Sequence, residues 1–307
     1  MTPLTFEVLV DDVLANVTST QALKAVAGKR ILSLINDFED GAWRTGRFNS
    51  FLWDNIAETA LSARERAALV DKGHSSLVAA AKNLRLTDRD VKGQGSEIAE
   101  IFLYGIMRSK FGALPVVPKI FYKQNSQDNA KGADSVHIVV HEGDFTLWFG
   151  EAKFYNSIEN ARLDSVVKSV LNSLRTDKIK KENSIITNVS DIETLDIPLV
   201  LCENIKKALD PKETIDCLKS KIHVPILLLH ECPITASTSC LSDEYRKDII
   251  DFHTERASAY FSKQIAKSDS VFNYTDLHFE IILFPVPDKR IIVEGFLAAT
   301  TFYKAQA

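Results

Sequence analysis

A chain of 307 residues with 45% hydrophobic and 25% charged residues has the composition of a soluble globular protein with one large domain or two ordinary ones. Its longest apolar runs, at 224–230 and 280–287, have the length of a strand and fall well short of the roughly 20 residues that cross a bilayer, so we expect no membrane segment. The N-terminus shows no export signal, and we expect a cytoplasmic protein. The net charge of −4 excludes a surface that is basic throughout, while it permits a local basic patch.

Residues 1–92 are predicted to form a mainly helical region that follows an opening strand at 5–10. Apolar residues recur at a period close to 3.6 in 48–61 and in 75–86, which indicates two amphipathic helices. Glycines then interrupt the pattern, and Ser96 is expected to cap the helix that follows.

Residues 93–307 are predicted to form an α/β core. Up to residue 183 the order of elements is helix, three strands, helix, which is typical of this fold class. The expected helices are 97–110 and 160–183, and the expected strands are 120–123, 135–140 and 145–155. The core is expected to be completed by strands at 197–203, 224–231 and 278–286, a long helix at 243–267 and a final helix at 291–304.

Two acids and a lysine interrupt the apolar pattern of the predicted hairpin at 135–155. If Glu142 and Gly143 form a two-residue turn, Asp134 lies opposite Glu151; a turn shifted by one residue places Asp134 opposite Lys153 instead. Because Glu151 and Lys153 are two residues apart, they share one face of the strand, about 6–7 Å from each other. In either register the three polar groups converge.

Ionised groups on a buried sheet face are costly unless they are paired or bound to a metal. Two carboxylates are hard oxygen ligands that suit Mg²⁺ or Mn²⁺. A lysine beside them can orient or deprotonate a metal-bound water and stabilise charge on a phosphoryl oxygen. The combination indicates phosphodiester hydrolysis. Glu97 and Glu100 lie on one face of the preceding helix, so either can add a carboxylate if that face packs toward the open end of the hairpin.

The spacing D-x16-E-x-K after an acidic helix resembles that of the PD-(D/E)xK nuclease superfamily. The strings "GSEIAEIFLY", "PKIFYKQNSQDNAKGADSVHIV" and "LWFGEAKFY" together resemble the HamA family, the nuclease subunits of the two-gene Hachiman antiphage defence system. Upstream, "RFNSFLWDNIAETALSARER" resembles the N-terminal region of that family, so the resemblance covers roughly 47–171. Ala133 stands where the superfamily has a proline.

The resemblance implies a restriction-endonuclease-like PD-(D/E)xK core and a metal-dependent DNA endonuclease that acts with HamB, a superfamily 2 helicase. By the family pattern, Asp134 and Glu151 would bind Mg²⁺ or Mn²⁺, and Lys153 would serve the attacking water. Glu97 would be the helix acid that completes the catalytic and metal-binding set, with Glu100 as the second choice.

Basic residues near this core have two interpretations. Lys178, Lys180 and Lys181 form either a solvated helix end or a patch that contacts DNA phosphates beside the catalytic sheet. Lys123 and Lys131 flank the loop before the hairpin and are further candidates for phosphate contact.

The other polar and aromatic residues of the hairpin are interpreted as structural. His137 and His141 lie on the strand face opposite Asp134, because side chains alternate along a strand, and we expect them to pack or to lie at the surface. Trp148 and Phe149 belong to an apolar run and are expected in the core.

Two other functions are compatible with the sequence. The chain could be a non-enzymatic subunit that keeps a degenerate nuclease fold and binds a partner. It could also be a sequence-specific restriction endonuclease, which would cut DNA into discrete fragments.

Overall fold

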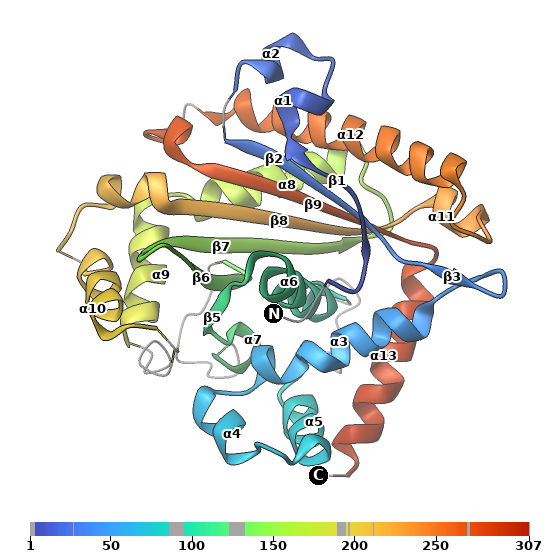
Figure 1. The fold of residues 1–307 in the computed structure, drawn as a ribbon, viewed down its shortest axis with the longest axis horizontal. Helices are drawn as coiled ribbons and strands as arrows, with labels where there is room; N and C mark the ends of the chain where they lie inside the picture. The colour runs from blue at the N-terminus through green and yellow to red at the C-terminus, as the bar shows by residue number, and fades with distance from the viewer. Residues whose placement is uncertain are drawn as a thin grey trace.

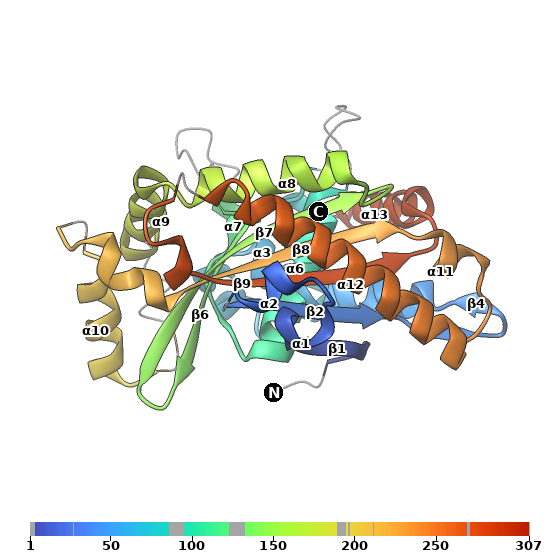
Figure 2. The ribbon, with the colours of Figure 1, turned by 90° about the horizontal axis from the view of Figure 1, so that it is seen from above.

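The computed structural model of the chain describes residues 4–26, 28–85, 95–122, 133–188, 195, 197–210, 212–268 and 271–306. A seven-stranded mixed sheet forms its centre, and helices cover both faces (Figures 1 and 2). The strand order is β1-β2-β9-β8-β7-β6-β5. The predicted α/β class is therefore confirmed.

The sheet combines a parallel centre with antiparallel edges. Its strands are β1 (Glu7–Val13), β2 (Lys29–Ile35), β5 (Leu114–Val117), β6 (Ser135–His141), β7 (Asp144–Tyr155), β8 (Ile222–Glu231) and β9 (His278–Val286). Neighbours among β2, β9, β8 and β7 are parallel, whereas the pairs β1–β2, β7–β6 and β6–β5 are antiparallel. The central strands β8 and β9 are buried on both faces, which explains their nearly continuous apolar sequences. A small separate hairpin consists of β3 (Phe38–Glu39) and β4 (Ala42–Trp43).

Two groups of helices bury opposite faces of the sheet. Leu227 and Leu229 of β8 pack with residues of α3 (Thr45–Ala60), α5 (Gly73–Lys82), α6 (Ser96–Phe111) and α13 (Lys289–Lys304). Ile226 and Leu228 pack with residues of α8 (Asn160–Ser173), α9 (Thr176–Asn188), α10 (Leu199–Ala208) and α12 (Asp243–Ile265). In Figure 1, α6 lies in front of the sheet and α8 behind it.

Shorter helices connect these elements. They are α1 (Leu14–Val17), α2 (Gln21–Lys24), α4 (Ala63–Ala68), α7 (Lys119–Tyr122), α11 (Pro233–Ser237) and the 3₁₀ helices η2 (Ile215–Lys221) and η4 (Tyr274–Asp276). Within the part of the chain that the structure describes, none of the helices is both long and apolar enough to span a bilayer.

The β6–β7 hairpin has one of the two registers expected from the sequence. Glu142 and Gly143 form the turn with φ of 44° and 85°, the two positive values that a type I′ turn requires. Ser135 pairs with Gly150 along the hairpin, which places Asp134 opposite Glu151. The alternative register, with Asp134 opposite Lys153, is wrong.

Helix α6 begins differently from the prediction. Ser96 is its first residue and not its cap; Gly95 stands at the N-cap position with φ of 99° and makes no side-chain cap. Glycine suits this position because side chains rarely adopt a φ of 99°, and a Cβ atom would also lie 3.0 Å from the ring of Phe154. Further along the helix, a Cβ on Gly105 would lie 2.4 Å from Phe51, so this glycine lets α3 and α6 approach closely.

Several elements differ from the sequence prediction. The strand expected at 120–123 is the helical turn α7, and the strand of this region is β5. The strand expected at 197–203 is helix α10, which starts after Pro198, buries Leu201 and Ile205 and leaves Leu199 exposed. A short apolar run does not distinguish a strand from a helix by its periodicity, and only the packing of one face shows which forms.

The helix expected at 160–183 is divided into α8 and α9 around residues 174–175. Strand β2 was not predicted, and together with β1 it joins the same sheet as the strands from the later part of the chain. The division of the chain at residue 92 stays a prediction.

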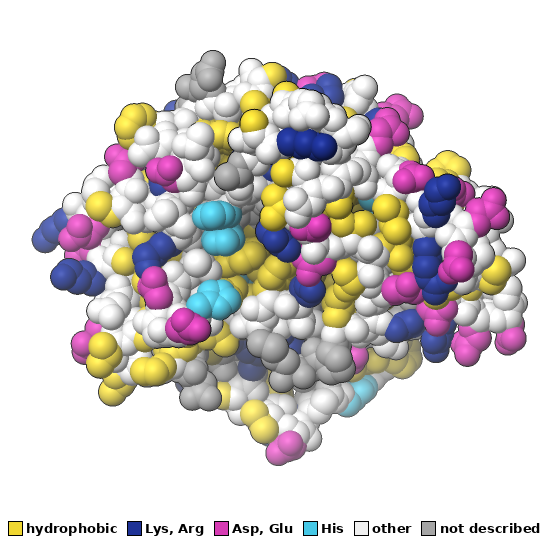
Figure 3. Space-filling model, turned by 45° about the horizontal axis from the view of Figure 1, so that its top comes forward, with side chains coloured by type: hydrophobic (Ala, Val, Ile, Leu, Met, Phe, Trp, Pro, Cys, Tyr) yellow, Lys and Arg dark blue, Asp and Glu magenta, His cyan; other side chains and the backbone are white. Residues whose placement is uncertain are grey.

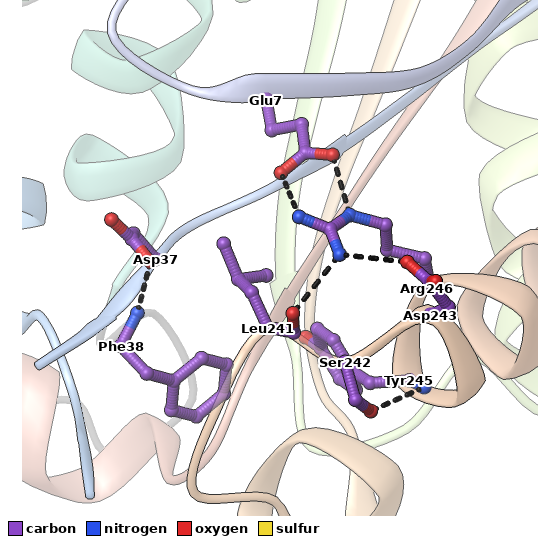
Figure 4. A network of polar contacts seen from close by, with 8 residues as sticks. All are labelled: Glu7, Asp37, Phe38, Leu241, Ser242, Asp243, Tyr245 and Arg246. Carbon is purple, nitrogen blue, oxygen red and sulfur yellow. Dashed lines mark hydrogen bonds and ion pairs between the residues drawn. The ribbon is translucent and has the colours of Figure 1, made fainter.

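The N-terminus of α12 is fastened to the edge strand β1 (Figure 4). The side chain of Ser242 caps the helix by accepting the N–H of Tyr245 at 3.0 Å. One turn later, Arg246 donates to Glu7 of β1 at 2.8 Å and to the carbonyl of Leu241 at 2.9 Å. The contact joins residues 239 positions apart in the chain and holds α12 on its face of the sheet.

Candidate active site on the hairpin

The structure brings Asp134, Glu151 and Lys153 together on the face of the sheet that α8 covers. The Nζ atom of Lys153 lies 3.0 Å from Oδ2 of Asp134 and 2.7 Å from Oε1 of Glu151. The side chains of Asp134, Glu151 and Lys153 are 17%, 7% and 29% exposed, so the lysine is the member most open to solvent. The predicted convergence of the three groups is thus present.

The backbone of β7 holds Asp134 in place. Its N–H donates to the carbonyl of Gly150 at 2.7 Å, and its Oδ2 accepts the N–H of Ala152 at 3.1 Å. A Cβ atom on Gly150 would lie 2.1 Å from Oγ of Ser135, so glycine allows the start of β6 to approach β7 this closely. Gly150 thus leaves room for the side chain of Ser135 on the sheet face opposite the acids.

Glu151 is anchored by a residue that the sequence did not single out. Oγ of Ser169 in α8 donates to Oε1 of Glu151 at 2.6 Å, the same oxygen that Lys153 contacts. Both of these contacts to Glu151 therefore fall on one carboxylate oxygen, Oε1. In the sequence, Ser169 is a polar residue beside Val166 and Val170 on the buried side of an amphipathic helix. Its partner could not be predicted, because the contact to Glu151 depends on how the helix packs on the sheet.

The charges of the three groups are strongly coupled. Burial and the charge of Asp134 raise the pKa of Glu151 above its ordinary value, although Lys153 and Ser169 oppose the shift. Burial lowers the pKa of Lys153, but the two carboxylates outweigh it, so the ammonium pKa is raised. One cation thus faces two carboxylates in a poorly solvated place, where a second cation would be stabilised.

A pocket of about 260 Å³ adjoins Glu151 between β7, α8 and α9. Its polar lining consists of Glu151, Ser169, Asn172, Ser173, Lys178 and Glu182. Of the lysines predicted to contact DNA, Lys178 lines this pocket. Lys180 and Lys181 do not line it, and Lys123 and Lys131 lie outside the described residues.

At the C-terminal end of β7, an arginine lies at the rim of the site. The guanidinium carbon of Arg162 is 5.5 Å from the centroid of the Tyr155 ring. Burial raises the pKa of Tyr155, while the charges of Lys153 and Arg162 lower it, which places both cations near this phenol. Arg162 was missed from the sequence because one arginine at the start of a helix has no distinctive pattern.

The two helix acids lie on the other side of the sheet. Glu97 and Glu100 belong to α6, which packs against the face opposite to the side chains of Glu151 and Lys153. The carboxylate of Glu97 accepts the N–H of Arg85 at 3.0 and 3.1 Å. Glu100 is 4% exposed. Within the described ranges, no group of three or more His, Cys, Asp and Glu is arranged to hold a metal ion.

The fold and site define an α/β protein with a carboxylate pair and a lysine on a hairpin inside a mixed sheet. A profile of the HamA family matches residues 11–299, and the chain belongs to this family. Membership supports a role in antiphage defence as part of the Hachiman system. No protein with curated annotation matches the chain.

Proposed function

We propose that this protein is a metal-dependent deoxyribonuclease with a PD-(D/E)xK core and is the effector of its defence system. The observation that carries the proposal is the convergence of Asp134, Glu151 and Lys153 within 3.0 Å contacts on one sheet face. Two acids and a lysine in this arrangement suit phosphodiester hydrolysis. The helicase HamB is the proposed regulatory partner.

The residues present fit a magnesium ion. Mg²⁺ is commonly bound through one or two carboxylates, several waters and substrate phosphates, so Asp134 and Glu151 are a sufficient protein set. The raised pKa of Glu151, caused by burial and by the charge of Asp134, is the electrostatic condition that a divalent cation relieves. When bound, Mg²⁺ or Mn²⁺ supplies an activated water and Lewis-acid stabilisation of the phosphate.

The side chains of the site have separate roles in this proposal. The N–H of Ala152 fixes Oδ2 of Asp134, and Ser169 fixes Oε1 of Glu151, so both carboxylates are oriented before substrate arrives. The ammonium of Lys153 donates a hydrogen bond to the attacking water and stabilises charge on the phosphoryl oxygen. The family pattern makes Glu97 the helix acid, with Glu100 as the second choice, but α6 packs on the opposite face of the sheet, so the proposed metal-binding set consists of Asp134 and Glu151.

Contacts to DNA are proposed on both sides of the hairpin acids. Lys178 lines the pocket beside Glu151, and Arg162 lies beside Tyr155 at the C-terminal end of β7. Lys180 and Lys181 belong to the same helix as Lys178 and are kept as proposed phosphate contacts.

The surface charge supports dependence on a partner. On the face in Figure 3, basic and acidic side chains are interspersed, and they do not form one basic surface. The net charge is −4. Because affinity for DNA depends on neutralised phosphates, we expect the isolated chain to bind DNA weakly at physiological salt. Tight binding by the isolated chain would contradict this expectation.

Cleavage of supercoiled plasmid in Mg²⁺ tests the proposed activity, with the protein alone and with HamB and ATP. Asp134→Asn, Glu151→Gln and Lys153→Met should each lower the rate by about 100-fold or more while thermal unfolding shows a folded protein. Glu142→Gln, an exposed acid at the turn of the same hairpin, is the control and should cut like the wild type. A wild type that never cuts, alone or with the partner, refutes the nuclease.

The same experiments separate the two alternatives. Discrete fragments from linear DNA would identify a sequence-specific restriction endonuclease. If Asp134→Ala leaves protection against phage intact, the chain acts as a non-enzymatic subunit that binds its partner.

A further inference from the structure

A buried ion pair lies at the edge of the sheet where β6 begins. Nζ of Lys119 in α7 is 2.6 Å from Oε2 of Glu182 in α9, and the two side chains are only 1% and 5% exposed. Removing two charges from water is costly, and the attraction between them compensates only if the geometry is good and the remaining hydrogen bonds are made. The pair is therefore weak evidence for stability, and one attested use of such pairs is to select a conformation.

The second oxygen of Glu182 is also used. Oε1 accepts the N–H of Ala133 at 3.0 Å, and Ala133 is 3% exposed. Ala133 immediately precedes Asp134 in the chain. Lys119 and Ala133 stand on either side of residues 123–132, so a single carboxylate holds the chain before and after that segment.

The consecutive backbone amides of Ala133 and Asp134, just before β6, are thus fixed from different elements. The N–H of Ala133 is held by Glu182, and the N–H of Asp134 is held by the carbonyl of Gly150. From this place the carboxylate of Asp134 reaches the N–H of Ala152. Glu182 also lines the pocket beside Glu151, so the same carboxylate borders the site.

We propose that Glu182, held in turn by Lys119, is a positioning residue that sets the place of the Asp134 carboxylate. It acts through the backbone of Ala133. The inference rests on the proposed function in so far as Asp134 binds the metal. Loss of a residue that holds a metal ligand in place typically weakens metal affinity by about 10- to 100-fold.

A pair of double variants isolates this role. A single substitution at either residue leaves a buried charge without its partner, which can prevent folding. Lys119→Met combined with Glu182→Gln removes both charges and keeps an oxygen acceptor for Ala133. Lys119→Met combined with Glu182→Met also removes both charges and has a side chain of similar length, but it offers no such acceptor. Both proteins lose the two charges, and only the Glu182→Gln protein keeps a side-chain oxygen that can accept the N–H of Ala133.

Two measurements are made on both double variants and the wild type. NMR hydrogen exchange at the N–H of Ala152 reports the position of the Asp134 carboxylate without any metal. Titration calorimetry with Mg²⁺ alone reports metal affinity. We expect the Glu182→Met protein to exchange this amide faster and to bind Mg²⁺ about tenfold more weakly or worse, while the Glu182→Gln protein is rescued on both counts.

The outcomes are distinct. Equal exchange at Ala152 in the two double variants overturns the inference, and so does faster exchange with unchanged Mg²⁺ affinity. If the wild type binds no Mg²⁺, the proposed function fails, and the exchange at Ala152 alone then decides whether Glu182 positions Asp134.

Discussion

Replacement of His137 should make the protein markedly less sensitive to acid. His137 lies on β6 with 1% exposure, and its ring packs on Tyr104 of α6 at a centroid distance of 4.3 Å. Both ring nitrogens are buried without a hydrogen-bond partner among the described residues. Burial lowers the pKa of His137 from its ordinary value to about 3. The imidazole is therefore neutral in the folded protein well below neutral pH.

The sign of the effect follows from linkage. Below a pH of about 6.5 the unfolded chain binds a proton at this residue and the folded chain does not, so stability falls as the pH decreases from there toward 3. The loss is about 1.4 kcal/mol per pH unit, or about 2 kcal/mol between pH 7 and pH 5. His137→Phe removes the titrating group, so the variant should lose about 2 kcal/mol less than the wild type over this range.

Urea unfolding at pH 7, 6 and 5 measures the difference. Changes in packing caused by the phenyl ring shift the free energy of unfolding equally at each pH, so the slope is the criterion. Other buried histidines, such as His230 and His253, contribute equally to both proteins. The exposed His141 on the same strand provides the comparison, and His141→Gln should change the slope less than His137→Phe does. Parallel loss of stability in wild type and His137→Phe would refute a neutral buried imidazole.

Two further predictions concern the candidate site. Ser169→Ala removes the 2.6 Å hydrogen bond to Glu151 and should weaken Mg²⁺ binding by about 10- to 100-fold, as measured by calorimetry. The control, Ser165→Ala at an exposed serine of the same helix, should bind Mg²⁺ as the wild type does. Equal affinities in the two variants would show that Ser169 does not orient Glu151. Arg162→Gln should reduce, by about 0.9, the slope of the logarithm of the duplex-DNA binding constant plotted against the logarithm of the salt concentration. Lys168→Gln, the same charge change at an exposed position of α8, should leave this slope unaltered. Equal slopes in the two variants would show that Arg162 does not contact DNA.

The central hairpin could be predicted because its register depends on local interactions. The two apolar runs within 135–155 indicated both strands, and a turn at Glu142 and Gly143, one of the two registers expected, places Asp134 opposite Glu151. The long helix α12 and the final helix α13 were likewise predicted from the sequence. Where an apolar run was short, as in 197–203, the sequence could not distinguish helix from strand.

The supporting residues of the site could not be predicted in this way. Ser169 and Glu182 come from α8 and α9, and their contacts to Glu151 and Ala133 form only because these helices pack on one face of the sheet. The helix acids show the same dependence. The sequence allowed Glu97 or Glu100 to join the hairpin acids if their helix face packed toward them, but α6 packs on the opposite face.

The sequence by itself determined the three polar groups of the hairpin and the strand face that they share, because the side-chain period of a strand and the geometry of a two-residue turn are local properties of the backbone. Only the tertiary structure decided which helix covers that face, which serine anchors Glu151, and that a buried carboxylate holds the chain before Asp134. These contacts join residues distant in sequence, and they arise when the apolar faces of separate elements are buried together, which no local pattern specifies.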